Sequence, residues 1–233
     1  MIGVGTIARE YCSGGAELGR IVAAKLGWEL LDRQLIDRVA RVAGVDPKVA
    51  INLDEHANRW WEWIVTGLSY AAPYAYNPPG QAGVIDVNVL RDITMWLIQR
   101  AADSGKCVIV GRGAQCVLQG RVDVLNILAY APIDERILRL RVRRPDCADY
   151  EALVNRIDSQ RASYLRQYHR RNLLDKSLYD LCINPALGLD VAAELITTAI
   201  SRAKQPRNTT NQQSYDPLGG DSSQTGEKRT RTW

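Results

Sequence analysis

Four apolar residues flanked by glycines, Cys107-Val-Ile-Val110, restrict the fold of this chain more than any other feature. A continuous apolar run of strand length is typical of a strand that is buried on both faces of a parallel sheet. Parallel strands are joined by crossover connections, which are usually helices. The run therefore predicts an α/β fold, provided that strands and helices alternate along the rest of the chain.

The apolar pattern does alternate in this way. Further short strands are predicted at about 2–7, 28–31, 125–130 and 179–183. Helical spacing and capping residues predict helices over about 17–26, 32–42, from 46, and over about 89–102, 133–143, 150–171 and 190–203. In a sheet of this kind, ligands bind at the carboxyl ends of the strands.

Composition narrows the classes of function. The 233 residues carry a formal net charge of +4, well short of the clustered positive charge of a dedicated nucleic-acid binder. Five cysteines without C-x-x-C spacing indicate neither a disulfide framework nor a zinc site. The sequence has no basic leader and no apolar run of about 20 residues. We therefore expect a cytoplasmic protein with reduced thiols, which neither enters a membrane nor binds a specific nucleic acid.

Two segments differ in composition from the rest. Residues 204–233 are rich in polar and charged residues, which predicts a disordered tail after a single domain of residues 1–203. Residues 60–76 are rich in tryptophan and tyrosine, a composition that favours a core or an interface over a base-stacking surface. This aromatic segment could form the apolar face of a homodimer.

The stretch from Tyr11 to Arg20, Y-C-S-G-G-A-E-L-G-R, lies between the first predicted strand and the first predicted helix. A glycine loop at this place presents backbone N–H groups to one point, and the start of a helix adds partial positive charge. The usual phosphate-binding motif is G-x-x-x-x-G-K-S/T, but here Gly15 stands at the lysine position and Glu17 is close to the hydroxyl position. This stretch alone leaves open both a phosphate-binding loop and a plain strand-to-helix turn.

The wider chain resembles the cytidylate kinase-like family, a divergent branch of the P-loop nucleoside monophosphate kinases. The resembling blocks occur in one order and are A-R-E-Y-C-S-G-G-A-E-L-G-R (8–20), L-L-D-R-Q-L-I (30–36), V-I-V-G-R-G-A (108–114), A-Y-A-P-I-D-E-R (129–136), R-I-D-S-Q-R-A-S-Y-L-R-Q-Y (156–168) and Y-D-L-C-I-N (179–184). The branch typically has a loop like R-E-Y-G-S-G-G, which also lacks the lysine. Cys12 departs from it, because glycine is usual there, and a side chain could narrow the loop or alter its backbone angles.

The resemblance implies a three-layer sandwich of the P-loop NTPase type around a five-stranded parallel sheet. It also implies a helical insertion for the nucleoside monophosphate at about 45–100 and an arginine-bearing lid at about 145–175. The implied activity is transfer of the γ-phosphoryl group of ATP, with Mg²⁺, to a nucleoside monophosphate, and CMP or dCMP is the first guess. The alternative is a nucleotide-sensing or partner-binding module that keeps the fold without turnover.

The resemblance further assigns roles to individual residues. The ATP phosphates would be bound by Cys12, Ser13, Gly14, Gly15, Ala16 and Glu17. The catalytic candidates are Arg161, Arg166 and Asp32, and the candidates for binding the acceptor are Arg112 and Arg33. The loop after Asn184 would lie against the adenine.

Each role has a plainer alternative. Arg161 and Arg166 could lie on the solvated face of a long helix, and their five-residue separation does not let them share one face of a regular helix. Arg112 could belong to a structural ion pair, and Asp32 could cap a helix. Arg9 and Arg20 flank the loop and could supply the charge of the missing lysine.

Overall fold

The computed structural model describes residues 1–32 and 87–203, with only the backbone of 87–90 and of Ile93. Arg33, the helices predicted at 32–42 and from 46, most of the predicted insertion at 45–100, the aromatic segment and the tail at 204–233 lie outside the described residues. None of the helices in the two described ranges is long and apolar enough to cross a membrane.

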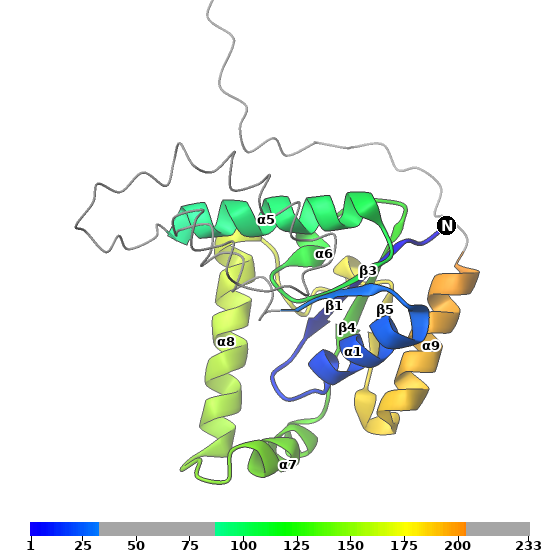
Figure 1. The fold of residues 1–233 in the computed structure, drawn as a ribbon. Helices are drawn as coiled ribbons and strands as arrows, with labels where there is room; N and C mark the ends of the chain where they lie inside the picture. Colours follow the sequence, from blue (N-terminus) through cyan, green and yellow to red (C-terminus); the bar gives the residue numbers. More distant parts are fainter. Residues whose placement is uncertain (33–86, 204–233) are drawn as a thin grey trace, which may run out of the picture.

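Five strands form a single parallel sheet in the order β2-β3-β1-β4-β5. Their bounds are β1 Val4–Arg9, β2 Glu29–Leu31, β3 Cys107–Val110, β4 Val124–Ala129 and β5 Leu181–Ile183. The central strand is β1, whose Val4 pairs with Cys107 of β3 and with Val124 of β4. The α/β fold and the five-stranded parallel sheet expected from the sequence are confirmed (Figure 1).

Helices cover both faces of the sheet and make three layers. On one face lie α1 (Gly15–Leu26) and α9 (Leu189–Arg202), which pack against each other. On the other face lie α5 (Val87–Ser104) and the short α6 (Ala114–Val117). The remaining elements are α7 (Ile133–Arg143), α8 (Tyr150–His169) and two single 3₁₀ turns, Lys176–Leu178 and Pro185–Leu187.

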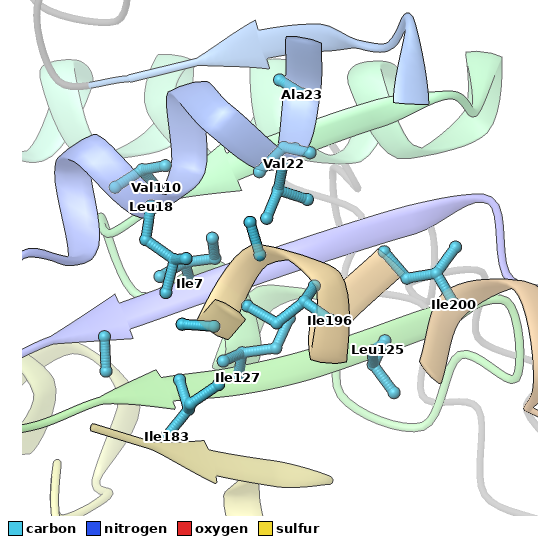
Figure 2. Close-up of a cluster of buried hydrophobic side chains, with 14 of the residues drawn as sticks. Ile7, Leu18, Val22, Ala23, Val110, Leu125, Ile127, Ile183, Ile196 and Ile200 are labelled. Atoms are coloured by element: carbon cyan, nitrogen blue, oxygen red, sulfur yellow. The ribbon is translucent and has the colours of Figure 1, made fainter. Parts of the chain in front are cut away.

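The core is divided by the sheet because successive side chains of a strand point to opposite faces. Val108 and Val110 of β3 join the cluster under α1 and α9, which also includes Leu18 and Ile196 (Figure 2). Cys107 and Ile109 of the same strand join the cluster under α5. The apolar run that predicted this strand is thus buried on both faces, as expected.

Helices α7 and α8, residues 133–169, form what we call the α7–α8 arm. The two helices pack against each other and lie beside the loop that connects β1 to α1 (Figure 1). The helix bounds differ from the predicted ones by no more than two residues for α1, α5, α7, α8 and α9. Helix α6 was not predicted, because four residues are too short to show helical periodicity.

Candidate functional site

The loop between β1 and α1, residues 10–14, is called the glycine loop below. Cys12 has a φ of 59° and Gly14 a φ of 93°, so two of its residues lie in the left-handed region. The Ser13 side chain is fully buried, and its hydroxyl donates a hydrogen bond to the Glu10 carbonyl at 3.0 Å. Gly14 is the residue before α1, and no side chain of the described residues caps this helix. The first N–H groups of α1 are therefore available to an anion.

Gly15, which stands at the lysine position of the usual motif, lies in close packing contact with the sheet. A Cβ atom on Gly15 would lie 2.7 Å from Arg9 Cβ and 3.0 Å from Ala129 Cβ. Real Cβ atoms do not approach other atoms this closely, so no side chain fits at residue 15 without moving the strands. Glycine at this position lets α1 pack close to the sheet.

Arginines of α7 supply positive charge to the glycine loop instead. Arg139 Nη1 donates to the carbonyl oxygens of Ser13 and Cys12. Arg143 forms an ion pair with Glu17, which neutralises the carboxylate in the first turn of α1. The sequence interpretation missed both arginines. Their spacing is a signal that could have found them, because Arg136, Arg139 and Arg143 recur at helical intervals of three and four residues.

A group of three charged side chains, of which Arg136 is buried and the other two are partly exposed, connects the glycine loop to the α7–α8 arm. Asp158 of α8 accepts a hydrogen bond from the Tyr11 backbone N–H at 2.7 Å and forms an ion pair with Arg136. The Nε atom of Arg136 lies 3.8 Å from Glu10 Oε2, which accepts from the Ala131 N–H at 3.0 Å. The Arg136 side chain is only 10% exposed, so its pairing with two carboxylates is what makes its burial tolerable.

A pocket of about 290 Å³ opens at the carboxyl ends of β1 and β3, beside the glycine loop. It is lined by Ala8, Arg9, Gly111, Arg112, Gly113, Gln115, Ile157, Gln160, Arg161, Tyr164, Leu165 and Leu173. Three of these side chains are guanidinium groups, and Gln115 and Tyr164 add polar atoms that are not acidic. A pocket with this lining is suited to an anionic ligand.

Two glycines shape the wall of this pocket. A Cβ atom on Gly111 would lie 1.6 Å from Arg9 Nη1, so the Arg9 guanidinium occupies the space that a side chain would take. A Cβ atom on Gly113 would lie 2.6 Å from Nε2 of His169, the last residue of α8. Between them Arg112 has a φ of 58°, again in the left-handed region. The loop after β3 is thus fixed by side chains from β1 and from α8.

The predicted site residues are brought together only in part. Arg161 lines the pocket, donates to the Arg9 carbonyl at 2.8 Å and has its Cζ atom 5.6 Å from the centre of the Tyr11 ring. Arg166 is exposed and does not line the pocket, because α8 is one regular helix and five residues rotate by about 140° around it. Asp32 follows the last residue of β2 at the same edge of the sheet.

The segment that was expected to lie against the adenine is next to the glycine loop. A Cβ atom on Gly14 would lie 3.3 Å from Pro185 Cβ and 3.0 Å from Arg139 Nη1. Asn184 fixes the segment, because its side chain accepts a hydrogen bond from the Ala186 N–H at 3.0 Å. The uncapped start of α1, the glycine at residue 14 and the Arg139 guanidinium together fit a nucleotide phosphate approaching from this edge.

The carboxylates of the described residues are not grouped as a magnesium site. In the described ranges, no group of three or more His, Cys, Asp or Glu side chains could hold a metal ion. Glu17 and Asp158 are engaged in ion pairs, and Glu10 accepts the Ala131 N–H. Protein ligands for Mg²⁺ are therefore not assembled by these residues.

Burial shifts the pKa values of several groups around the pocket. Burial raises the pKa of the Tyr164 hydroxyl, and the nearby Arg112 opposes this effect. Burial also raises the pKa of the Cys12 thiol, which keeps it protonated. The pKa of His169 is lowered by burial and by the charge of Arg91, so its imidazole is neutral at neutral pH.

Comparison with known proteins identifies the family. The sequence model of the cytidylate kinase-like family matches residues 4–186. No curated protein matches the chain. Among solved structures, an uncharacterized protein from Eubacterium ventriosum is 19% identical, with a TM-score of 0.62 and coverage of 87% of this chain and 99% of that chain, and it shares the fold.

Two shikimate kinases are more distant matches. The enzyme from Acinetobacter baumannii, solved with shikimate, is 15% identical, with a TM-score of 0.47 and coverage of 88% of this chain and 97% of its own. The enzyme from Bacteroides thetaiotaomicron is 12% identical, with a TM-score of 0.46 and coverage of 86% and 99%. The family match spans most of the sequence, and this chain belongs to the cytidylate kinase-like family.

Proposed function

We propose that this chain is a kinase that transfers the γ-phosphoryl group of ATP to a nucleoside monophosphate, with CMP and dCMP as the first candidates. The observation that carries the proposal is the position of the arginine-lined pocket beside the uncapped start of α1. Phosphoryl transfer needs positive charge and positioning more than covalent chemistry by the protein. The proposal takes this charge from side chains of β1, α7 and α8 and of the loop after β3.

On the donor side, the N–H groups at the start of α1 and the Arg139 guanidinium would bind the ATP phosphates. In this proposal the phosphates are bound by backbone N–H groups and not by side chains of the loop and of the first turn of α1. The residues concerned are Cys12, Ser13, Gly14, Gly15 and Ala16. Glu17 would not repel the phosphates, because Arg143 neutralises its charge. The adenine would lie against the segment from Asn184 to Ala186, where backbone groups suffice for contact. Magnesium bound with the nucleotide would neutralise phosphate charge.

On the acceptor side, Arg112 would hold the phosphate of the nucleoside monophosphate. Arg161 would interact with the transferred phosphoryl group, because it lines the same pocket and reaches the end of β1. The planar guanidinium suits two-point binding of phosphate oxygens. Arg166 stays a candidate only if α8 moves. Asp32 would accept a hydrogen bond from the acceptor hydroxyl, and Arg33 would bind the acceptor nucleotide.

The remaining parts of the proposal concern the setting of the protein. All five cysteines are free thiols, which supports a reducing compartment such as the cytoplasm. We propose a kinase-like domain of residues 1–203 with an acceptor insertion and a lid, and the family match over residues 4–186 supports this segmentation. A homodimer that uses the aromatic segment is compatible with this arrangement.

The test is turnover of ATP with each nucleoside monophosphate in the presence of magnesium, followed as ADP. We expect turnover with at least one pyrimidine acceptor and a loss of about 10²–10³-fold in Arg161→Ala. Arg156→Ala is the matched control, since this arginine is exposed on the same helix and does not line the pocket. Equal losses in the two variants would contradict the role of Arg161.

A nucleotide-sensing module without turnover is the second candidate. The missing lysine, the side chain at Cys12 and the lack of a metal-ligand group in the described residues favour it. ATP binding by calorimetry without ADP formation from any acceptor would establish this alternative. Absence of both binding and turnover would refute both functions.

A further inference from the structure

Cys12 brings a side chain into the glycine loop, and that side chain has a defined place in the structure. It is 6% exposed and belongs to a cluster with Leu140 of α7 and Val154 of α8, both fully buried. The cluster is completed by half-buried apolar residues of the same two helices and by Tyr11. A residue of the glycine loop is thereby inserted between two helices that follow it by more than a hundred positions in the chain.

The backbone conformation of Cys12 has an energetic cost, which the packing of its side chain offsets. A φ of 59° is disfavoured for residues with a Cβ atom. Three other described residues that are not glycine share a positive φ, namely Lys106, Arg112 and Arg170, and none of them is buried. Burial of the Cys12 side chain between α7 and α8 is the compensation that the structure provides.

Polar contacts tie the same part of the loop to the same two helices. The Tyr11 N–H donates to Asp158 of α8, and Arg139 of α7 donates to the Cys12 and Ser13 carbonyls. Arg161 lies on α8 three residues after Asp158, about one helical turn away. One of the contacts that fix the loop, through Asp158, and the side chain that enters the pocket, Arg161, therefore belong to the same helix.

We propose that Cys12 is a positioning residue that anchors the glycine loop to the α7–α8 arm. The buried side chain restricts the backbone of the loop, which a glycine would leave more flexible. Because it packs against α8, it also fixes the position of the loop relative to Arg161 on that helix. The thiol takes no chemical part, because burial keeps it protonated and inaccessible. The effect on nucleotide affinity rests on the proposed function, whereas the anchoring itself does not.

The first test measures amide hydrogen exchange in peptides that cover the glycine loop, without any nucleotide. We expect Cys12→Gly to raise the exchange rate of the loop amides by roughly tenfold, since local opening no longer exposes a buried side chain. Val154→Ala removes the other side of the contact and is expected to have the same effect. Cys107→Ala is the control, because this cysteine is equally buried but lies in β3 on the far side of the sheet.

Exchange of the β4 amides reports global stability in each variant and separates local from global effects. Faster exchange confined to the loop and the α7–α8 arm in both Cys12→Gly and Val154→Ala supports the anchor. Loop exchange at the wild-type rate in either variant overturns it, as does an equal change in Cys107→Ala. If either Cys12→Gly or Val154→Ala fails to fold, loop exchange in the other variant still tests the anchor.

The second test measures ATP affinity by calorimetry and, where there is turnover, kcat and KM. We expect the dissociation constant of ATP to rise about tenfold in Cys12→Gly, because a loop that must be ordered on binding costs affinity. A wild-type protein that binds no ATP refutes the proposed function, and the exchange result then still tests the anchor. If the loop amides exchange faster in Cys12→Gly but the affinity for ATP is unchanged, Cys12 does not position the loop for nucleotide binding.

Discussion

Replacing Asp158 by alanine tests the connection between the glycine loop and the α7–α8 arm most directly. The Asp158 side chain is 22% exposed and pairs with Arg136, whose side chain is 10% exposed. Its other oxygen accepts the Tyr11 N–H at 2.7 Å. The substitution would leave the buried guanidinium with Glu10 alone, 3.8 Å away, and would leave the Tyr11 N–H without its acceptor.

The size of the effect follows from these contacts. Removing one partner of a buried ion pair costs about 3–5 kcal/mol, and the partial exposure of Asp158 together with the remaining Glu10 places the loss near 3 kcal/mol. For a chain of this length each kcal/mol corresponds to about 2–4 °C, so the Tm should fall by about 6–12 °C. Asp158→Asn keeps an oxygen for the Tyr11 N–H and should lose only about half as much.

Urea unfolding measures this loss, provided that the slope of the transition is unchanged. The matched control is Asp103→Ala, whose side chain is 58% exposed and pairs with Arg121, an arginine that also binds Asp123. An exposed pair of this kind should contribute less than about 1 kcal/mol. If Asp158→Ala is no more destabilising than Asp103→Ala, the buried charges do not hold the loop and the reasoning is wrong.

Two further predictions concern single contacts in the site. Burial lowers the pKa of His169, so as the pH drops the unfolded chain takes up a proton on this imidazole before the folded chain does. Stability should therefore fall as the pH drops from 7.5 to 5.5. His169→Gln should lose less stability than the wild type over this range in urea unfolding, and an equal loss would show that another group is responsible. Gly15→Ala should destabilise the fold by about 1–3 kcal/mol, since its Cβ atom would meet Arg9 and Ala129. Gly3→Ala is the control and should be close to neutral in the same assay, because no atom lies within 4 Å of the new Cβ.

The fold could be predicted largely because buried parallel strands are visible as apolar runs. The bounds of β3 agree with the run from Cys107 to Val110, since glycines terminate it on both sides. The other strands and the long helices were placed to within about two residues for the same reason, with capping residues fixing the ends. Helix α6 escaped because its few residues have no period of their own.

From the residue pattern alone, the candidate site was predictable only where it follows a strand, whereas Arg161 on α8 came from the family resemblance. Arg112 comes directly after β3, so its place at the pocket follows from topology. Arg136 and Arg139 were missed because an arginine-rich helix reads as a solvated surface until its partners are known. Their partners, the carbonyls of the glycine loop and the Asp158 carboxylate, are separated from them by 22 to 127 positions in the chain. The spacing of these arginines shows only that they share one face of the helix, and it does not identify partners so far away in the chain.

Helix α1 is attached to the sheet at two glycines that are one turn apart. A Cβ atom on Gly15 would touch Arg9 and Ala129, and one on Gly19 would lie 2.5 Å from Val110 Cγ2. With so little space between helix and strands, α1 cannot slide or tilt without a clash. We expect the start of α1 to be the immobile side of the site. Among the described elements around the site, the α7–α8 arm is held to the loop by side chains, and we expect any opening among these elements to occur on that side.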